Sequence, residues 1–115
     1  MTDTRTPSEF RDETWAAVAG RLHGMRSYLY TELTCRGPLT TRQVAYETGV
    51  ELLTVRPRIC ELVKMGLAEL APEHLQTQGT EGVYQAVPLD VARQRHIERQ
   101  AEFARSGQMQ LRIGA

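Results

Sequence analysis

The sequence predicts a small, mainly α-helical domain with one short β-hairpin. Apolar residues recur at helical spacing over most of the chain, and single glycines interrupt these stretches. Two runs of strand-forming residues flank a polar loop. With 115 residues, 41% of them hydrophobic, the chain has enough apolar material for one globular domain and too little length for two.

Composition excludes several classes of protein. No apolar run approaches the roughly 20 residues of a membrane span, and no secretory leader is recognisable. We therefore expect a soluble, cytoplasmic protein without membrane partners. The two cysteines, Cys35 and Cys60, form no Cys-x-x-Cys pair, so neither a disulfide framework nor a zinc ribbon is indicated.

The charge is balanced, with 14 basic and 14 acidic residues. Of the basic residues 13 are arginine, which suits contacts with phosphate and guanine. A GC-rich genome produces the same bias, and both explanations stay open.

The first third of the chain is predicted to be helical. Thr6 is the expected N-cap of a helix that runs to about His23. Gly24 separates it from a continuation with helical spacing, which a Gly-Pro pair at 37–38 ends. The stretch is either two helices or one long helix with a weak point at Gly24.

The middle of the chain has the densest pattern. Thr40 or Thr41 is expected to cap a short helix that ends at Gly49, and another helix is predicted for residues 52–65. The apolar stripe of the second helix consists of Val55, Ile59 and Leu62. The strands of the hairpin are predicted at 67–71 and 83–87.

A last helix is expected to begin at Pro88 and to end at Gly107. In the tail after it, apolar and polar residues alternate, which is compatible with a strand or with a disordered terminus. The predicted organisation is an N-terminal helix, a central domain, a C-terminal helix and a tail, at 1–24, 25–87, 88–107 and 108–115.

Two segments of the central domain resemble a known family. Residues 39–50 read LTTRQVAYETGV, in which Ala45 lets two helices approach and Gly49 makes the turn. Residues 54–67 read TVRPRICELVKMGL, and the ending Glu-Leu-x-x-x-Gly-Leu is similar to the passage from a recognition helix into a wing. Residues 25–87 therefore resemble bacterial and phage winged helix-turn-helix DNA-binding proteins, among them the MarR-like and ArsR-like regulators.

The resemblance implies sequence-specific binding of double-stranded DNA and regulation of transcription by occupancy of the site. The helix at 52–65 would lie in the major groove. The same fold also serves in protein–protein interaction adaptors that do not bind DNA, and the neutral charge favours that alternative.

A helical projection of residues 52–65 gives the expected DNA contacts. With the apolar stripe inward, the outward and flanking positions are Leu53, Thr54, Arg56, Pro57, Arg58, Cys60 and Lys64. We expect Thr54, Arg56 and Arg58 to touch phosphates or bases. Leu53 and Pro57 are placed against thymine methyl groups.

Two uncertainties attach to this helix. The alternative to a DNA contact is a solvated helix whose arginines pair with Glu51 or Glu61. Pro57 has no N–H, so either the first turn is loose or the regular helix begins near Arg56.

Neighbouring elements supply further expected contacts. Arg36 and Arg42 lie at the ends of the preceding elements, where the motif meets the phosphate backbone. Thr40 and Thr41 can donate to phosphate as well as cap a helix.

The predicted wing departs from the family pattern. It has no lysine or arginine between Leu67 and Ala92, and it contains Glu73 and Glu81. The wing residues that remain as DNA contacts are Gln76, Thr77 and Gln78.

No enzyme chemistry is expected. The three histidines, His23, His74 and His96, lack metal-ligand spacing, and no phosphate-binding glycine loop or catalytic triad is recognisable. We therefore predict no catalytic residue, metal, cofactor or small-molecule substrate. Cys60 is either a redox-sensing thiol or an inert cysteine.

The flanking helices predict a homodimer. Both carry more apolar surface than a small core needs, and a two-fold dimer would match a palindromic DNA site. The expected interface residues are Trp15, Val18, Leu22, Ile97 and Phe103. The alternative is that the two helices pack on each other within one chain.

Overall fold

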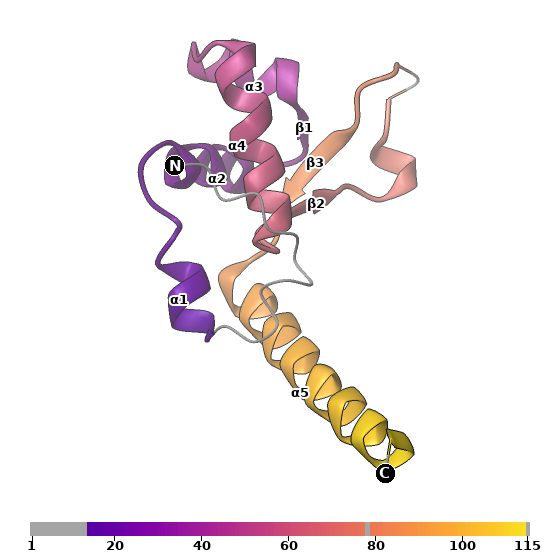
Figure 1. Ribbon diagram of the computed structural model, residues 1–115. Coiled ribbons are helices and arrows are strands. Elements are labelled where there is room, and N and C mark those ends of the chain that lie inside the picture. The colour runs from indigo at the N-terminus through magenta and orange to yellow at the C-terminus, as the bar shows by residue number, and fades with distance from the viewer. Residues whose placement is uncertain (1–13, 78, 115) are drawn as a thin grey trace.

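The structure, a computed structural model, describes residues 14–77 and 79–114, with side chains up to Ser106. These residues form five α-helices and a three-stranded antiparallel sheet, which confirms a mainly helical domain with a hairpin. In chain order (Figure 1) the elements are α1 (Trp15–Ala19), α2 (Gly24–Arg36), β1 (Leu39–Thr40), α3 (Thr41–Thr48), α4 (Leu52–Lys64), β2 (Ala68–Leu70), a 3-10 helix (Glu73–Leu75), β3 (Val83–Ala86) and α5 (Leu89–Gly114).

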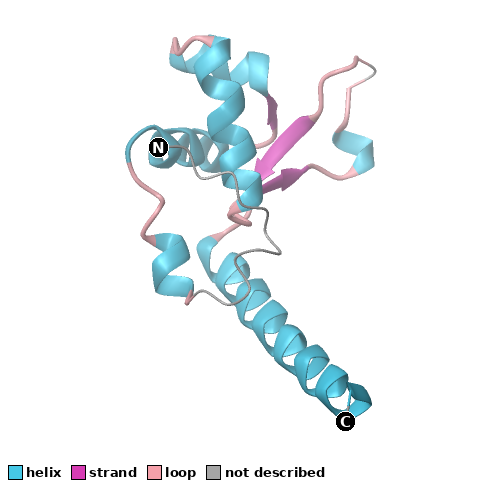
Figure 2. Cartoon of the chain, viewed as in Figure 1, coloured by secondary structure: helices cyan, strands magenta, loops and turns pink. Residues whose placement is uncertain are grey.

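The sheet has one strand more than the sequence predicted. β2 and β3 form the predicted hairpin, with Leu70 opposite Tyr84. β1 pairs with the other side of β3, through Leu39 opposite Tyr84, so the order is β1-β3-β2 (Figure 2). A strand of two residues is too short to show alternation, and its partner lies more than 40 residues away in the chain. Because β1 leads directly into α3, this pairing ties the start of α3 to the sheet.

The core lies where α2 and α4 meet the sheet. The predicted stripe of α4 is buried, and it packs with Leu29 and Leu33 of α2. Burial of Val55, Ile59 and Leu62 fixes the rotation of α4 about its axis, so its opposite face is turned to solvent.

Tyr30 links α2 to the segment that precedes α5. Its hydroxyl donates to the carbonyl of Val87 at 2.7 Å. Burial raises the pKa of Tyr30, although the Thr34 hydroxyl acts in the opposite direction, so the phenol is the protonated donor at neutral pH.

The N-terminal helix is short where it is described. The predicted N-cap Thr6 lies outside the described residues, and Thr14 caps α1 by accepting from the N–H of Ala17 at 3.2 Å. α1 is followed by Gly20, and α2 begins at Gly24, so the alternative of two separate helices is correct.

α5 is longer than predicted. It continues through Gly107 to Gly114, in place of the predicted end at Gly107 and the predicted strand or disordered tail. A glycine inside a helix costs only about 1 kcal/mol relative to alanine, so a single glycine does not by itself end a helix. The C-terminal part of α5 extends away from the rest of the chain, which spans 56 Å along its longest axis (Figure 1).

The flanking helices contact each other within the chain. The ring of Trp15 lies 6.0 Å from the ring of His96 on α5, and His96 is buried. Val18 is fully buried in the same core, and Leu22 packs against it. Val18 therefore has no surface left for a partner, which corrects its assignment to a dimer interface.

Candidate nucleic-acid interface

The turn between α3 and α4 is defined at both ends. Thr40 caps α3 in a reciprocal pair with Gln43: the N–H of Gln43 donates to Thr40 Oγ1 at 3.1 Å, and the N–H of Thr40 donates to Gln43 Oε1 at 2.8 Å. Gly49, with φ 73°, ends α3 in the left-handed conformation that glycine adopts most easily. Thr40 is thus the cap, and its buried hydroxyl is engaged within the chain.

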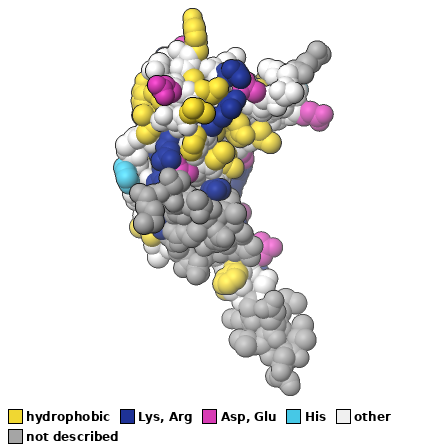
Figure 3. Space-filling view, turned by 45° about the horizontal axis from the view of Figure 1, so that its top comes forward, with side chains coloured by type: hydrophobic (Ala, Val, Ile, Leu, Met, Phe, Trp, Pro, Cys, Tyr) yellow, Lys and Arg dark blue, Asp and Glu magenta, His cyan; other side chains and the backbone are white. Residues whose placement is uncertain are grey.

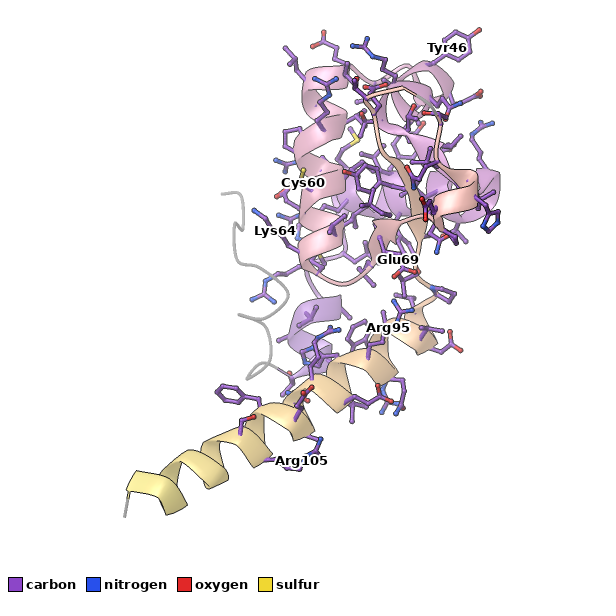
Figure 4. All side chains as sticks on the ribbon, turned by 90° about the vertical axis from the view of Figure 1, so that its right-hand side faces the viewer. Tyr46, Cys60, Lys64, Glu69, Arg95 and Arg105 are labelled. Carbon is purple, nitrogen blue, oxygen red and sulfur yellow. The ribbon has the colours of Figure 1, made fainter. Side chains whose placement is uncertain are left out.

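The outward face of α4 is exposed over its first two turns. Leu53 is 80% exposed, and Thr54, Arg56, Pro57 and Cys60 also lie on the surface, as the projection predicted. Lys64 at the end of the helix is half-buried. Figure 4 shows Cys60 and Lys64 along the same side of α4.

The first turn of α4 is regular in spite of the proline. The N–H groups of Thr54 and Val55 both donate to the carbonyl of Glu51, at 2.9 and 3.0 Å. The helix therefore begins at Leu52 and continues through Pro57, and neither a loose first turn nor a start near Arg56 is found.

The carboxylate of Glu81, in the loop between β2 and β3, contacts two of the predicted DNA-binding arginines. Its Oε1 lies 3.2 Å from Arg42 Nε on α3 and 3.2 Å from Arg56 Nη2 on α4. The sequence predicted partners for the α4 arginines at Glu51 or Glu61, and it gave no indication that Glu81 would reach them. A contact across 25 residues is visible only once the hairpin has folded back on α4.

The other predicted arginines are also paired. Arg58 Nε lies 2.7 Å from Glu61 Oε1, so the alternative interpretation, in which an α4 arginine pairs with Glu61, is correct for this residue. Arg36 pairs with Glu32 and lies 3.2 Å from Glu47. The hydrogen bond to Glu32 raises the pKa of Arg36 above its usual value.

Gln76 holds the wing loop closed. Its side-chain nitrogen donates to the carbonyls of Ala71 and Val83, at 2.8 and 3.0 Å, and its side-chain oxygen accepts from the N–H of Val83 at 2.8 Å. This amide is therefore engaged inside the loop, which corrects its assignment as a DNA contact. Thr77 is exposed, and Gln78 lies outside the described residues.

A shallow hollow of about 220 Å³ lies between α4 and the β2–β3 hairpin. It is lined by Thr41, Cys60 and Tyr84 together with the Arg56–Glu81 pair.

Cys35 and Cys60 are both exposed free thiols.

Exposed apolar side chains also lie near this face. Tyr46 of α3 is 86% exposed and points away from the domain (Figure 4). On the face drawn in Figure 3, Lys and Arg side chains form small separate groups among hydrophobic ones, and acidic side chains adjoin some of them. The surface is thus mixed and carries no continuous basic patch on this view.

Two of the residues predicted for a dimer interface lie on α5. Ile97 and Phe103 are 38% and 50% exposed. Arg95 points toward Glu69 of β2, with Nη1 2.8 Å from Oε2 (Figure 4).

Comparison with protein families, with curated proteins and with solved structures gives no match to this chain. In the described part of the chain, no group of three His, Cys, Asp or Glu side chains could hold a metal ion. None of the helices described combines the length and the apolar character needed to cross a membrane.

Proposed function

We propose that this chain is a winged helix-turn-helix protein that binds double-stranded DNA sequence-specifically and regulates transcription by occupying its site. The observation that carries the proposal is the exposed face of α4, from Leu53 to Cys60, directly after the left-handed turn at Gly49. A helix presented in this way fits the major groove, which is about 12 Å wide.

The order of elements supports the same proposal. α2, β1, α3, α4 and the β2–β3 hairpin follow one another as in a winged helix-turn-helix domain. The hairpin lies on the Arg56 side of α4, where a wing would meet the DNA backbone next to the groove.

The proposed contacts divide into two kinds. Thr54 and Arg56 read base edges, and Leu53 and Pro57 touch thymine methyl groups. The residues that position the protein on phosphates are Arg36, Thr41, Arg42, Arg58 and Lys64.

A salt series tests the proposal. We expect affinity for a random-sequence duplex to fall steeply between about 50 and 200 mM salt, because each phosphate that is neutralised releases counterions. Sequencing of genomic fragments retained by the protein should give an enriched motif. A chain that retains no duplex at about 50 mM salt would contradict the proposal.

A protein-interaction adaptor is the second candidate. The ion pairs of Arg36, Arg42 and Arg56 with acids of the same chain favour it, because they reduce the attraction for phosphate. The exposed side chains of Tyr46 and Leu53 would then be anchors for a protein partner. The salt series separates the two candidates.

We also propose that the DNA-binding form is a homodimer. Of the five predicted interface residues, Ile97 and Phe103 on α5 are the most exposed, whereas Trp15 and Leu22 are half-buried and Val18 is buried.

A further inference from the structure

The wing presents an acid where a DNA-gripping wing presents a cation. Glu81 reaches two guanidinium groups that come from different helices, Arg42 at the start of α3 and Arg56 in the middle of α4. The three groups together carry one positive charge where the two arginines alone would carry two. A DNA phosphate that approached either arginine would meet the same carboxylate and be repelled by it.

The backbone that follows Glu81 is anchored to the rest of the hairpin. Two residues later, Val83 is bonded on both sides, since its carbonyl accepts from Ala71 N–H at 2.8 Å and its N–H donates to Gln76. Gly82 between them lies close to β2, since a Cβ there would be 2.9 Å from the end of the Leu70 side chain. The wing therefore holds Glu81 next to α4.

We propose that Glu81 is a specificity determinant that lowers affinity for DNA of any sequence by competing with backbone phosphates for Arg42 and, outside the preferred site, for Arg56. This inference rests on the proposed DNA binding. Non-specific binding is almost entirely attraction between cations and phosphates, so a competing carboxylate weakens it most. Binding at the preferred site also includes base contacts, which the carboxylate supports by orienting the Arg56 guanidinium.

The test compares Glu81→Gln with Glu73→Gln on a random-sequence duplex and on the motif enriched by the wild type. Glu73 is exposed and lies in the same hairpin loop. Each variant removes one negative charge, so the two change the net charge equally. We expect Glu81→Gln to tighten binding to the random duplex roughly three- to tenfold at about 50 mM salt. The slope of log affinity against log salt concentration should steepen by the equivalent of about one to two neutralised phosphates. Binding to the enriched motif should gain less, so the ratio of the two affinities should fall.

A second comparison shows whether the effect passes through the arginines. In a chain that already carries Arg42→Ala and Arg56→Ala, the change Glu81→Gln should have no more effect than Glu73→Gln. Glu81→Gln should also keep the melting temperature, since exposed pairs contribute little to stability.

Three results would overturn the inference. These are equal effects of Glu81→Gln and Glu73→Gln, a tightening that persists without the two arginines, and an unchanged ratio of affinities. Each would leave wild-type DNA binding intact and the proposed function standing. A wild type and variants that all fail to retain duplex at low salt would instead overturn the proposed function, and this inference with it.

Discussion

Glu61 on α4 and Arg26 on α2 form a buried ion pair, with Arg26 Nη2 2.7 Å from Glu61 Oε2 and side chains that are 10% and 4% exposed. The other carboxylate oxygen of Glu61 faces Arg58. The Arg26–Glu61 pair thus joins α2 to α4, and Arg58, on α4 itself, completes a cluster of one acid and two arginines. The orientation of the outward face of α4 depends on this cluster as well as on the apolar core.

Removal of Arg26 should destabilise the protein strongly. We expect Arg26→Met to lower the free energy of unfolding by about 3 kcal/mol, because a buried carboxylate loses the arginine that donates a hydrogen bond to it. The ion pair with Arg58 reduces the loss. The double variant Arg26→Met, Glu61→Met should recover most of it, since no buried acid remains. Urea denaturation measures the free energy of unfolding of the single and the double variant. The control is Arg36→Met, which removes an arginine from an exposed ion pair. Equal losses for Arg26→Met and Arg36→Met would contradict the prediction.

Arg56 should contribute more to DNA binding than Arg58. Arg56 is exposed on α4, whereas Arg58 is half-buried against Glu61. We expect Arg56→Ala to weaken binding to the preferred motif by about 1–3 kcal/mol if it reads a base, and to weaken all sequences alike if it touches only phosphate. A variant that lacks both arginines should bind weakly, mainly through the loss of Arg56.

The control for this comparison is Arg93→Ala, which removes an exposed arginine from α5. It should change affinity less than Arg56→Ala. If Arg56→Ala binds duplex as tightly as the wild type, the contact surface assigned to α4 is wrong.

Gln76 should matter for stability and Thr77 for neither stability nor binding. Gln76→Ala removes three hydrogen bonds to backbone groups of the loop between β2 and β3, although the Val83 carbonyl keeps its bond from Ala71 N–H. We expect a loss of about 1–3 kcal/mol and faster hydrogen exchange at the Val83 amide. Thr77→Ala should be neutral in thermal melts, and both should change DNA affinity less than Arg56→Ala. A stable Gln76→Ala variant with weakened DNA binding would restore Gln76 as a contact.

Local patterns predicted the parts of the fold that depend on neighbouring residues. The buried stripe of α4 follows from its helical spacing, and the end of α3 from Gly49. Two residues carry no periodicity from which β1 could be predicted, and Gly107 predicts an earlier end of α5 than the structure has. In both cases the outcome depends on energies that a single position does not reveal.

For the candidate site too, local patterns predicted which side chains are exposed but not what they contact. Projection of α4 predicted that Leu53 faces outward and that Arg56 lies on a flank, because the buried stripe fixes the opposite side. It did not predict the partners of those side chains. Glu81 reaches Arg56, and Gln76 turns into its own loop, through contacts that exist only after the hairpin closes.

Glu69 should make stability depend on pH in the acid range. Burial raises the pKa of this carboxyl, but hydrogen bonds from Gln85 and Arg95 outweigh it and leave the pKa lowered. A carboxyl with a lowered folded-state pKa stabilises the fold at neutral pH, and this contribution disappears as the pH falls through that lowered pKa. The effect is small because the side chain is partly exposed.

The measurement is the difference in melting temperature between the wild type and Glu69→Gln from neutral to acid pH. The wild type should be slightly more stable at pH near 7, and the difference should shrink to nothing at low pH. A difference that stays constant over the whole range would show that the ionised carboxylate is not its source.

The proposed homodimer should be held by α5. Ile97 and Phe103 are partly exposed on a helix that extends away from the domain, whereas Val55 is fully buried in the core. We expect sedimentation at micromolar concentration to show a dimer, and Ile97→Ala or Phe103→Ala to shift it toward monomer without unfolding. Val55→Ala should instead lower the stability, by about 1–3 kcal/mol, through the cavity it leaves. A 13.0 kDa species at every concentration would rule out the dimer. A dimer that both α5 variants leave intact would place the interface on another surface.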